Sequence, residues 1–91
     1  MSFVLHDKNG YLCDLASATT CLGFTQWLKK YNISNIASDF IKDGYTPHPR
    51  RLAGEITRLL SVNPPETHVK ELADAYIKGL RRAQGFAMLT Q

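Results

Sequence analysis

Long apolar runs are absent from this sequence of 91 residues, and cysteine is scarce. No segment approaches the roughly 18 apolar residues that a membrane-spanning helix needs. The opening residues MSFVLHDK lack the basic region and apolar core of a secretory signal peptide. The two cysteines, Cys13 and Cys21, are too few for a disulfide scaffold. We therefore expect a soluble cytoplasmic protein whose thiols stay reduced.

Glycine-rich phosphate loops and metal-ligand spacings are also missing. Glycines inside the helical patterns stand singly, which indicates close packing and not a ligand cradle. None of the three histidines, His6, His48 and His68, has a second ligand at a spacing typical of metal sites. Cys21 lies near an expected helix start, but a small buried cysteine is more common than a nucleophile in such a domain. We expect no cofactor, no metal and no enzymatic activity.

Charge of either sign is moderate. Eleven Lys and Arg residues oppose eight Asp and Glu residues, which gives a formal net charge of +3. Nucleic-acid binders usually gather many more cations on one face. The balance therefore permits nucleic acid or an acidic protein partner without requiring either. With 44% hydrophobic residues, the chain is predicted to fold as one domain, 1–91.

The stretch LHDKNGYLCDLAS, residues 5–17, places polar residues between two β-prone runs. A two-residue Asn-Gly turn would mix polar and apolar residues on each face of a hairpin. A three-residue loop with a bulge at Gly10 instead pairs Leu5 with Cys13. The predicted core face consists of Phe3, Leu5, Cys13, Leu15 and, near the tip, Tyr11. The predicted opposite face consists of Val4, His6, Leu12 and Asp14. This separation favours a structural hairpin over a catalytic or metal site.

Four segments after the hairpin have helical periodicity. The first covers residues 16–32, with Ser17 or Thr20 as N-cap. The second runs from a cap at Ser34 to a glycine stop at Gly44. The third begins at one of the prolines of YTPHP, which is otherwise read as a rigid connector. The fourth is expected to have Asn63 as N-cap, Pro64 at its first position and Glu66 at its third.

The last residues, FAMLTQ, are apolar and too few for a stable helix. A strand that returns to the hairpin would bury them and would stabilise a hairpin that is marginal alone. The predicted fold class is therefore α+β: an N-terminal β-hairpin, about four helices and a short C-terminal strand completing a small three-stranded sheet.

Candidate binding residues fall into two sets. The first set joins the polar hairpin face to the proline connector, since aromatic and Arg residues concentrate at protein interfaces. Its members are Tyr45, His48, Arg50, Arg51, His6 and Asp14. The alternative is a basic nucleic-acid surface on the C-terminal helix, where phosphate contacts could add up. Its members are Lys70, Lys78, Arg81 and Arg82.

The run LHDKNGYLCDLAS…FIKDGYTPHPRRLAGEI…LRRAQGFAMLT resembles small phage and prophage accessory proteins. The matching positions of the hairpin are Asp7, Gly10, Tyr11, Asp14, Leu15 and Ala16. The resemblance carries no catalytic residues. It implies a protein in the cytoplasm of a bacterial host cell that binds and inhibits or modulates a larger host protein. The partner class would include components of defence systems such as CRISPR-Cas, as for anti-CRISPR proteins.

Overall fold

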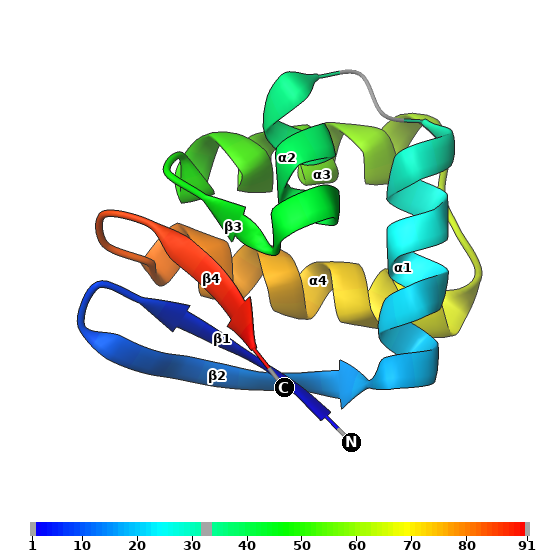
Figure 1. Ribbon diagram of the computed structural model, residues 1–91. Coiled ribbons are helices and arrows are strands. Elements are labelled where there is room, and N and C mark those ends of the chain that lie inside the picture. The colour runs from blue at the N-terminus through cyan, green and yellow to red at the C-terminus, as the bar shows by residue number, and fades with distance from the viewer. Residues whose placement is uncertain (1, 32–33, 91) are drawn as a thin grey trace.

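The computed structural model describes residues 2–31 and 34–90, and it contains one antiparallel sheet and four helices (Figure 1). The elements in chain order are β1 (Ser2–Asp7), β2 (Gly10–Ser17), α1 (Ala18–Lys30), α2 (Asn35–Asp43), β3 (Tyr45–Thr46), α3 (Pro49–Val62), α4 (Thr67–Arg82) and β4 (Ala87–Thr90). The strand order is β2-β1-β4-β3. The predicted α+β class is therefore confirmed.

The sheet has one strand more than the three predicted. The C-terminal segment does return to the hairpin, where Leu89 of β4 lies opposite Leu5 of β1. The extra strand, β3, pairs with the other edge of β4 and lies within the segment expected to be only a connector. Gly44 ends α2 in the left-handed conformation, as predicted, and its carbonyl accepts a hydrogen bond from the backbone N–H of Leu89 at 2.7 Å. This bond turns the chain onto β4, and two residues are too few to show a strand pattern in the sequence.

The predicted hairpin register is correct at Val4 and Leu5, wrong at the tip, and shifted again between Val4 and Ser2. Leu5 pairs with Cys13, as expected. His6, however, pairs with Tyr11 and not with Leu12, because the irregularity falls between the Leu5 and His6 pairs. One extra residue on β2 moves its neighbours to opposite faces. Tyr11 is consequently exposed, whereas Leu12 packs against the core, the reverse of the predicted faces.

The start of α4 also differs from the prediction. Asn63 is the C-cap of α3, where its N–H donates to the carbonyl of Leu59 at 2.8 Å. The fourth helix begins at Thr67, three residues later than Pro64. Pro65 explains the delay, because a proline disfavours helical conformation in the residue before it. At α1, the backbone places Thr20 inside the helix, so it is not the N-cap; its side chain and that of Ser17 are outside the described structure.

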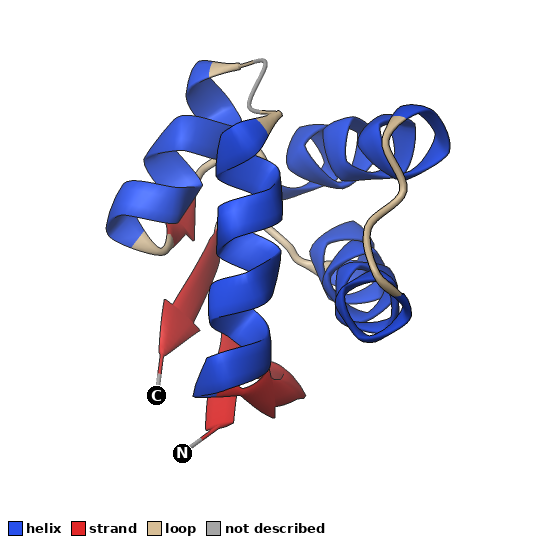
Figure 2. Ribbon diagram, turned by 90° about the vertical axis from the view of Figure 1, so that its right-hand side faces the viewer, coloured by secondary structure: helices blue, strands red, loops and turns tan. Residues whose placement is uncertain are grey.

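The core lies between the sheet and the helices, with α4 crossing the inner face of the sheet (Figures 1 and 2). Tyr76 of α4 is almost fully buried and stacks on Phe24 of α1 with ring centroids 4.3 Å apart. Phe40 of α2 meets the same ring edge-on at 5.9 Å. Burial raises the pKa of the Tyr76 hydroxyl, so this group stays neutral. The helices thus cover one face of the sheet, and the other face is left open.

Candidate functional site

A row of side chains, one from each strand, crosses the open face of the sheet. Tyr45 of β3 lies opposite Met88 of β4. Met88 lies opposite His6 of β1, which in turn lies opposite Tyr11 of β2. Tyr11 is 61% exposed, Tyr45 41% and Met88 39%. Directly opposed side chains of neighbouring strands are in contact range. The row is therefore a continuous apolar and aromatic strip in water.

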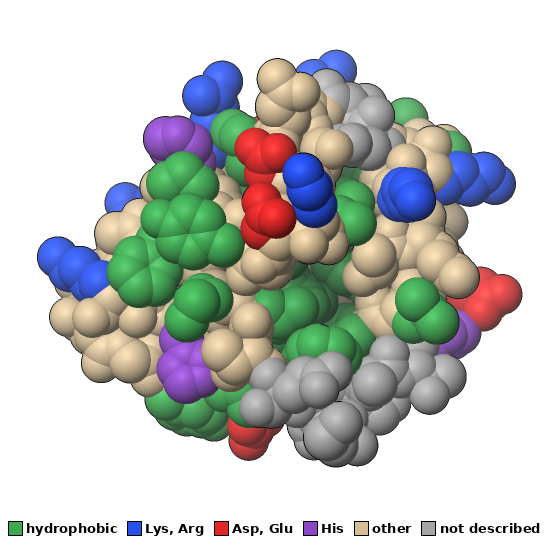
Figure 3. Space-filling view, in the orientation of Figure 1, with side chains coloured by type: hydrophobic (Ala, Val, Ile, Leu, Met, Phe, Trp, Pro, Cys, Tyr) green, Lys and Arg blue, Asp and Glu red, His purple; other side chains and the backbone are tan. Residues whose placement is uncertain are grey.

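Aromatic contacts occur at both ends of this row, and one of them adds a further residue. Phe86 precedes β4 and packs against Tyr45, with ring centroids 5.5 Å apart. The ring of His6 meets that of Tyr11 edge-on at 6.4 Å. We call His6, Tyr11, Tyr45, Phe86 and Met88 together the sheet face. Figure 3 shows hydrophobic side chains gathered over this part of the molecule, with histidine at their margins.

An acidic side chain borders the β2 end of the sheet face. Asp14 is exposed and lies opposite Val4, on the same side of the sheet as His6. Desolvation and, after it, the Asp14 carboxylate raise the pKa of the Tyr11 hydroxyl. This hydroxyl therefore remains a neutral donor over the physiological range, beside a fixed negative charge.

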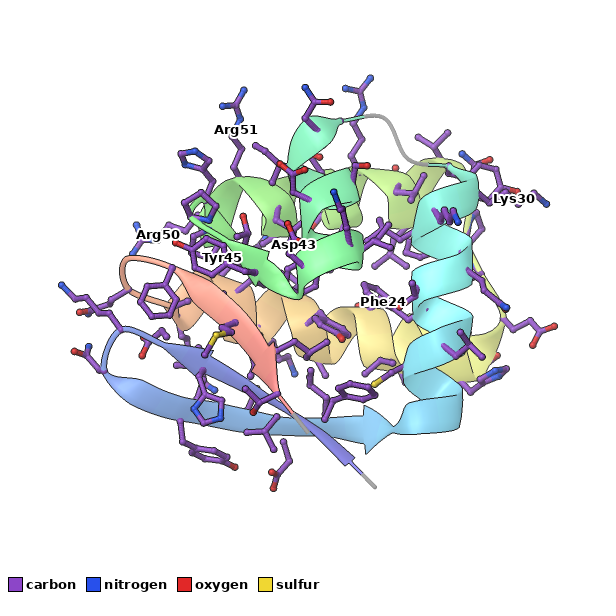
Figure 4. The ribbon with its side chains drawn as sticks, in the orientation of Figure 1. Phe24, Lys30, Asp43, Tyr45, Arg50 and Arg51 are labelled. Carbon is purple, nitrogen blue, oxygen red and sulfur yellow. The ribbon has the colours of Figure 1, made fainter. Side chains whose placement is uncertain are left out.

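The opposite end of the sheet face leads into a shallow depression of about 490 Å³. We call it the arginine hollow; it is lined by His48, Pro49, Arg50, Arg51, Ala83, Gln84 and Gly85. It lies where α3 starts and where the chain leaves α4. Figure 4 shows Arg50 and Arg51 projecting from the start of α3, with Arg50 near Tyr45 and Arg51 extending away from it. None of the described residues that line the hollow is acidic.

Hydrogen bonds that the Asp7 carboxylate accepts hold the hairpin tip against the rim of the arginine hollow. The Asp7 carboxylate is 6% exposed and accepts the backbone N–H of Gln84 at 2.9 Å and that of Asn9 at 2.8 Å. These bonds, that from Gln84 foremost, lower the pKa of Asp7. They place the exposed Lys8 beside Gly85, where an added Cβ would come within 3.1 Å of the Lys8 Cδ atom. Asp7 is thus a structural group that positions a cation.

The first predicted set of binding residues is brought together on one side of the molecule. Tyr45 and His6 share the row, His48, Arg50 and Arg51 line the hollow, and Asp14 marks the far end. Sequence reasoning missed Phe86 and Met88 as surface residues. Their alternation with the buried Ala87 was the available signal, but a four-residue apolar run does not reveal which alternate residues face inward.

The alternative basic set is only partly assembled. Lys78, Arg81 and Arg82 line a depression of about 440 Å³ that also contains Asp14 and Cys13. Arg82 there donates to the carbonyl of Leu12 at 3.4 Å. Lys70 lies two helical turns away, and the exposed acids Glu71 and Asp74 stand between. The surface of α4 is therefore mixed in charge.

Two kinds of feature are absent from the described part of the chain, namely a metal-binding group and a membrane-spanning helix. Within residues 2–31 and 34–90, no three His, Cys, Asp or Glu side chains come close enough together to hold a metal. In the same ranges, each helix is too short or too polar to cross a membrane. Cys21, which was considered as a nucleophile from the sequence, belongs to α1 and is buried, with 3% of its surface exposed.

Fold and site together define a small α+β domain with helices on one face of an antiparallel sheet and an exposed aromatic strip on the other. Comparison with known proteins finds no matching family model, no matching curated protein and no matching solved structure. The exposed surface is therefore the basis of the proposed function.

Proposed function

We propose that this chain is a non-enzymatic protein-binding module that occupies a site on a larger protein with its sheet face and arginine hollow. The observation that carries the proposal is the exposed row of Tyr45, Met88, His6 and Tyr11 across all four strands. Contiguous apolar patches on the surface of a small domain mark interaction sites more often than scattered apolar residues do. Aromatic, Met and Arg side chains are also the types enriched at protein interfaces.

The resemblance of the sequence to phage and prophage accessory proteins supports a partner inside a bacterial cell. On that basis we propose that binding inhibits or modulates the partner, and that components of defence systems such as CRISPR-Cas are the first partners to test. This step is an analogy with the resembled group and not a consequence of the geometry.

The rival proposal is nucleic-acid binding by Lys70, Lys78, Arg81 and Arg82 of α4. The observation in its favour is the depression shared by the last three of these cations. The interspersed acids weigh against it, because phosphate contacts must outnumber repulsions. It predicts binding that is lost in nuclease-treated samples and that falls steeply with salt.

The test is capture of partners from a bacterial lysate by the tagged chain, with and without nuclease, followed by purification of the captured protein and calorimetry. We expect the double variant Tyr45→Ala/Met88→Ala to weaken binding by about tenfold or more, as interface hot spots do. The matched control is Leu22→Ala/Val62→Ala, which truncates two residues that are 57% and 64% exposed elsewhere. If the two double variants bind the captured protein with equal affinity, the sheet face is not the binding surface.

A further inference from the structure

Charges of both signs border the sheet face. Lys8, Arg50 and Arg51 are exposed near the hairpin tip and the start of α3. Asp14 stands at the β2 end, in the depression that three cations of α4 line, and the exposed Asp43 lies two residues before Tyr45. The arginine hollow differs from these places, because its described lining contains two arginines and no acid. The hollow therefore suits a ligand that carries carboxylates.

The described lining of the arginine hollow contains no acid, and the exposed Asp43 near Tyr45 lies outside that lining. Asp7 is the nearest carboxylate on the hairpin, and both of its oxygens accept backbone N–H groups. Its bonds hold Lys8 beside Gly85, one of the residues that line the arginine hollow. Two arginines therefore line this depression, and a lysine from a distant chain segment lies beside its lining. Arg offers paired donors that suit carboxylates.

The composition of the sheet face distinguishes between two kinds of acidic ligand. Single-stranded nucleic acid is usually bound on flat, exposed aromatic rings, with cations along the whole strand. Here a flexible thioether, Met88, occupies the middle of the row, and the ring of Tyr11 meets His6 edge-on at 86°. Thioethers adapt to irregular apolar side chains. These features favour a polypeptide.

We infer that the surface recognises an acidic protein segment, with carboxylates seated in the arginine hollow and a neighbouring aromatic or aliphatic side chain packed on Tyr45, Phe86 and Met88. The inference rests on the proposed function, since it names the chemistry of the partner at the same site. The hollow supplies charge complementarity, and the sheet face supplies the apolar contact.

The experiment uses two fluorescein-labelled peptides and one oligonucleotide against the full chain, followed by fluorescence anisotropy. The first peptide surrounds one Trp and one Leu with Glu and Asp. The second replaces every Glu and Asp by Gln and Asn, and the oligonucleotide is an oligothymidylate. We expect the acidic peptide to bind about tenfold or more tightly than its neutral counterpart, because charge complementarity contributes most to discrimination between partners.

Charge reversal at the hollow is the decisive variant. Arg50→Glu/Arg51→Glu should abolish the preference for the acidic peptide. Arg58→Glu is the matched control, since this residue is exposed on the same helix, two turns beyond Arg50 and Arg51. Chemical-shift changes on addition of the peptide should fall on the lining of the hollow and on Phe86. Circular dichroism checks that every variant remains folded.

Each other result contradicts the inference in a distinguishable way. If both peptides bind equally and Tyr45→Ala weakens both, the sheet face is a protein-binding site and the acidic partner is wrong. If only oligothymidylate binds and Tyr45→Ala abolishes that binding, the face takes nucleic acid and the proposed function falls too. If none of the three probes binds, or if Arg58→Glu acts as strongly as the double variant, the acidic-segment inference is overturned.

Discussion

The two faces of the sheet share the same strands and differ in what their side chains do. On the inner face, Leu5 and Ala87 are completely buried, and Leu5 packs against α4 at Gly79. On the outer face, the neighbouring Met88 remains 39% exposed. Apolar surface removed from water stabilises the fold, by about 25 cal/mol per Å². The inner residues therefore stabilise the domain, and the outer ones remain available for association.

The aromatic pairs of the two regions also differ in burial. Phe24 and Tyr76 stack at 4.3 Å inside the core, where both rings are 1% exposed. Tyr45 and Phe86 lie 5.5 Å apart at the surface, tilted by 35°. The inner pair joins two helices. The outer pair lies at the surface and presents ring area that a partner can cover.

The largest expected effect is on the inner face. Leu5→Ala should lower the free energy of unfolding by about 3 kcal/mol, because it leaves a cavity beneath α4. Met88→Ala, on the neighbouring strand but facing outward, should cost less than about 1 kcal/mol. Urea denaturation of both variants measures the difference. Similar losses would show that the outer face belongs to the folding core.

Two helical glycines should change the free energy of unfolding in opposite directions when each is replaced by alanine. A Cβ at Gly79 would lie 2.7 Å from Leu5 Cδ2 and 3.0 Å from Cys13 Sγ. Gly79→Ala should therefore destabilise by about 1 kcal/mol or more, despite the helix propensity of alanine. Gly54 has no atom within 4 Å of such a Cβ, so Gly54→Ala should stabilise by roughly 0.5–1 kcal/mol. Thermal unfolding of the pair tests both signs.

A smaller effect is expected at the hairpin tip, and only in acid. The lowered pKa of Asp7 means that its contribution is complete above its ordinary value of 3.8 and is lost as the pH falls through the lower folded value. The unmodified chain should thus lose stability with falling pH below about 4, and Asp7→Asn should lose less over that interval. Asp74→Asn, an exposed site, is the control. Identical acid profiles of Asp7→Asn and the parent chain would contradict the assignment.

The smallest effect on stability is expected at the tip of the row. Tyr11→Ala should change the free energy of unfolding by no more than about 0.5 kcal/mol, because its ring is mostly in water. The same variant should weaken binding of the captured protein or of the acidic peptide. Stability and affinity measured on one preparation separate the two roles. A loss of stability as large as that of Leu5→Ala would show that Tyr11 contributes to the core, and it would contradict the distinction between the two faces.

Much of the helical structure was predictable because it depends on neighbours in the sequence. The buried stripe of α4, which includes Val69, Leu72 and Tyr76, follows from spacing alone. Ser34 caps α2 by accepting the N–H of Ala37, and Gly44 ends it at a φ of 65°. These signals act within one or two turns. The later start of α4 was not predicted, because Asn63, Pro64 and Glu66 match the pattern of a helix N-terminus. Pro65 overrides that pattern, since it disfavours helical conformation in the residue before it.

The candidate site was predicted only in part, because contacts between distant parts of the chain bring its residues together. The hydrogen bond from the Gln84 N–H to the Asp7 carboxylate joins residues 77 positions apart, and no pattern near Asp7 in the sequence predicts it. The bulge that exposes Tyr11 is set by how β1 and β2 pair under the helices. The strand at Tyr45 exists only because β4 is present to receive it. Such contacts depend on topology, which local patterns do not specify.

By itself, the sequence determined the four helices, their buried sides and the return of the C-terminal strand, because periodicity and capping act over short distances. It also indicated Tyr45, Arg50 and Arg51 as surface candidates. Only the tertiary structure decided that His6, Tyr11, Tyr45 and Met88 form one row beside the arginine hollow. An alternating pattern states which residues share a face, but strand register and burial select the face that remains in water.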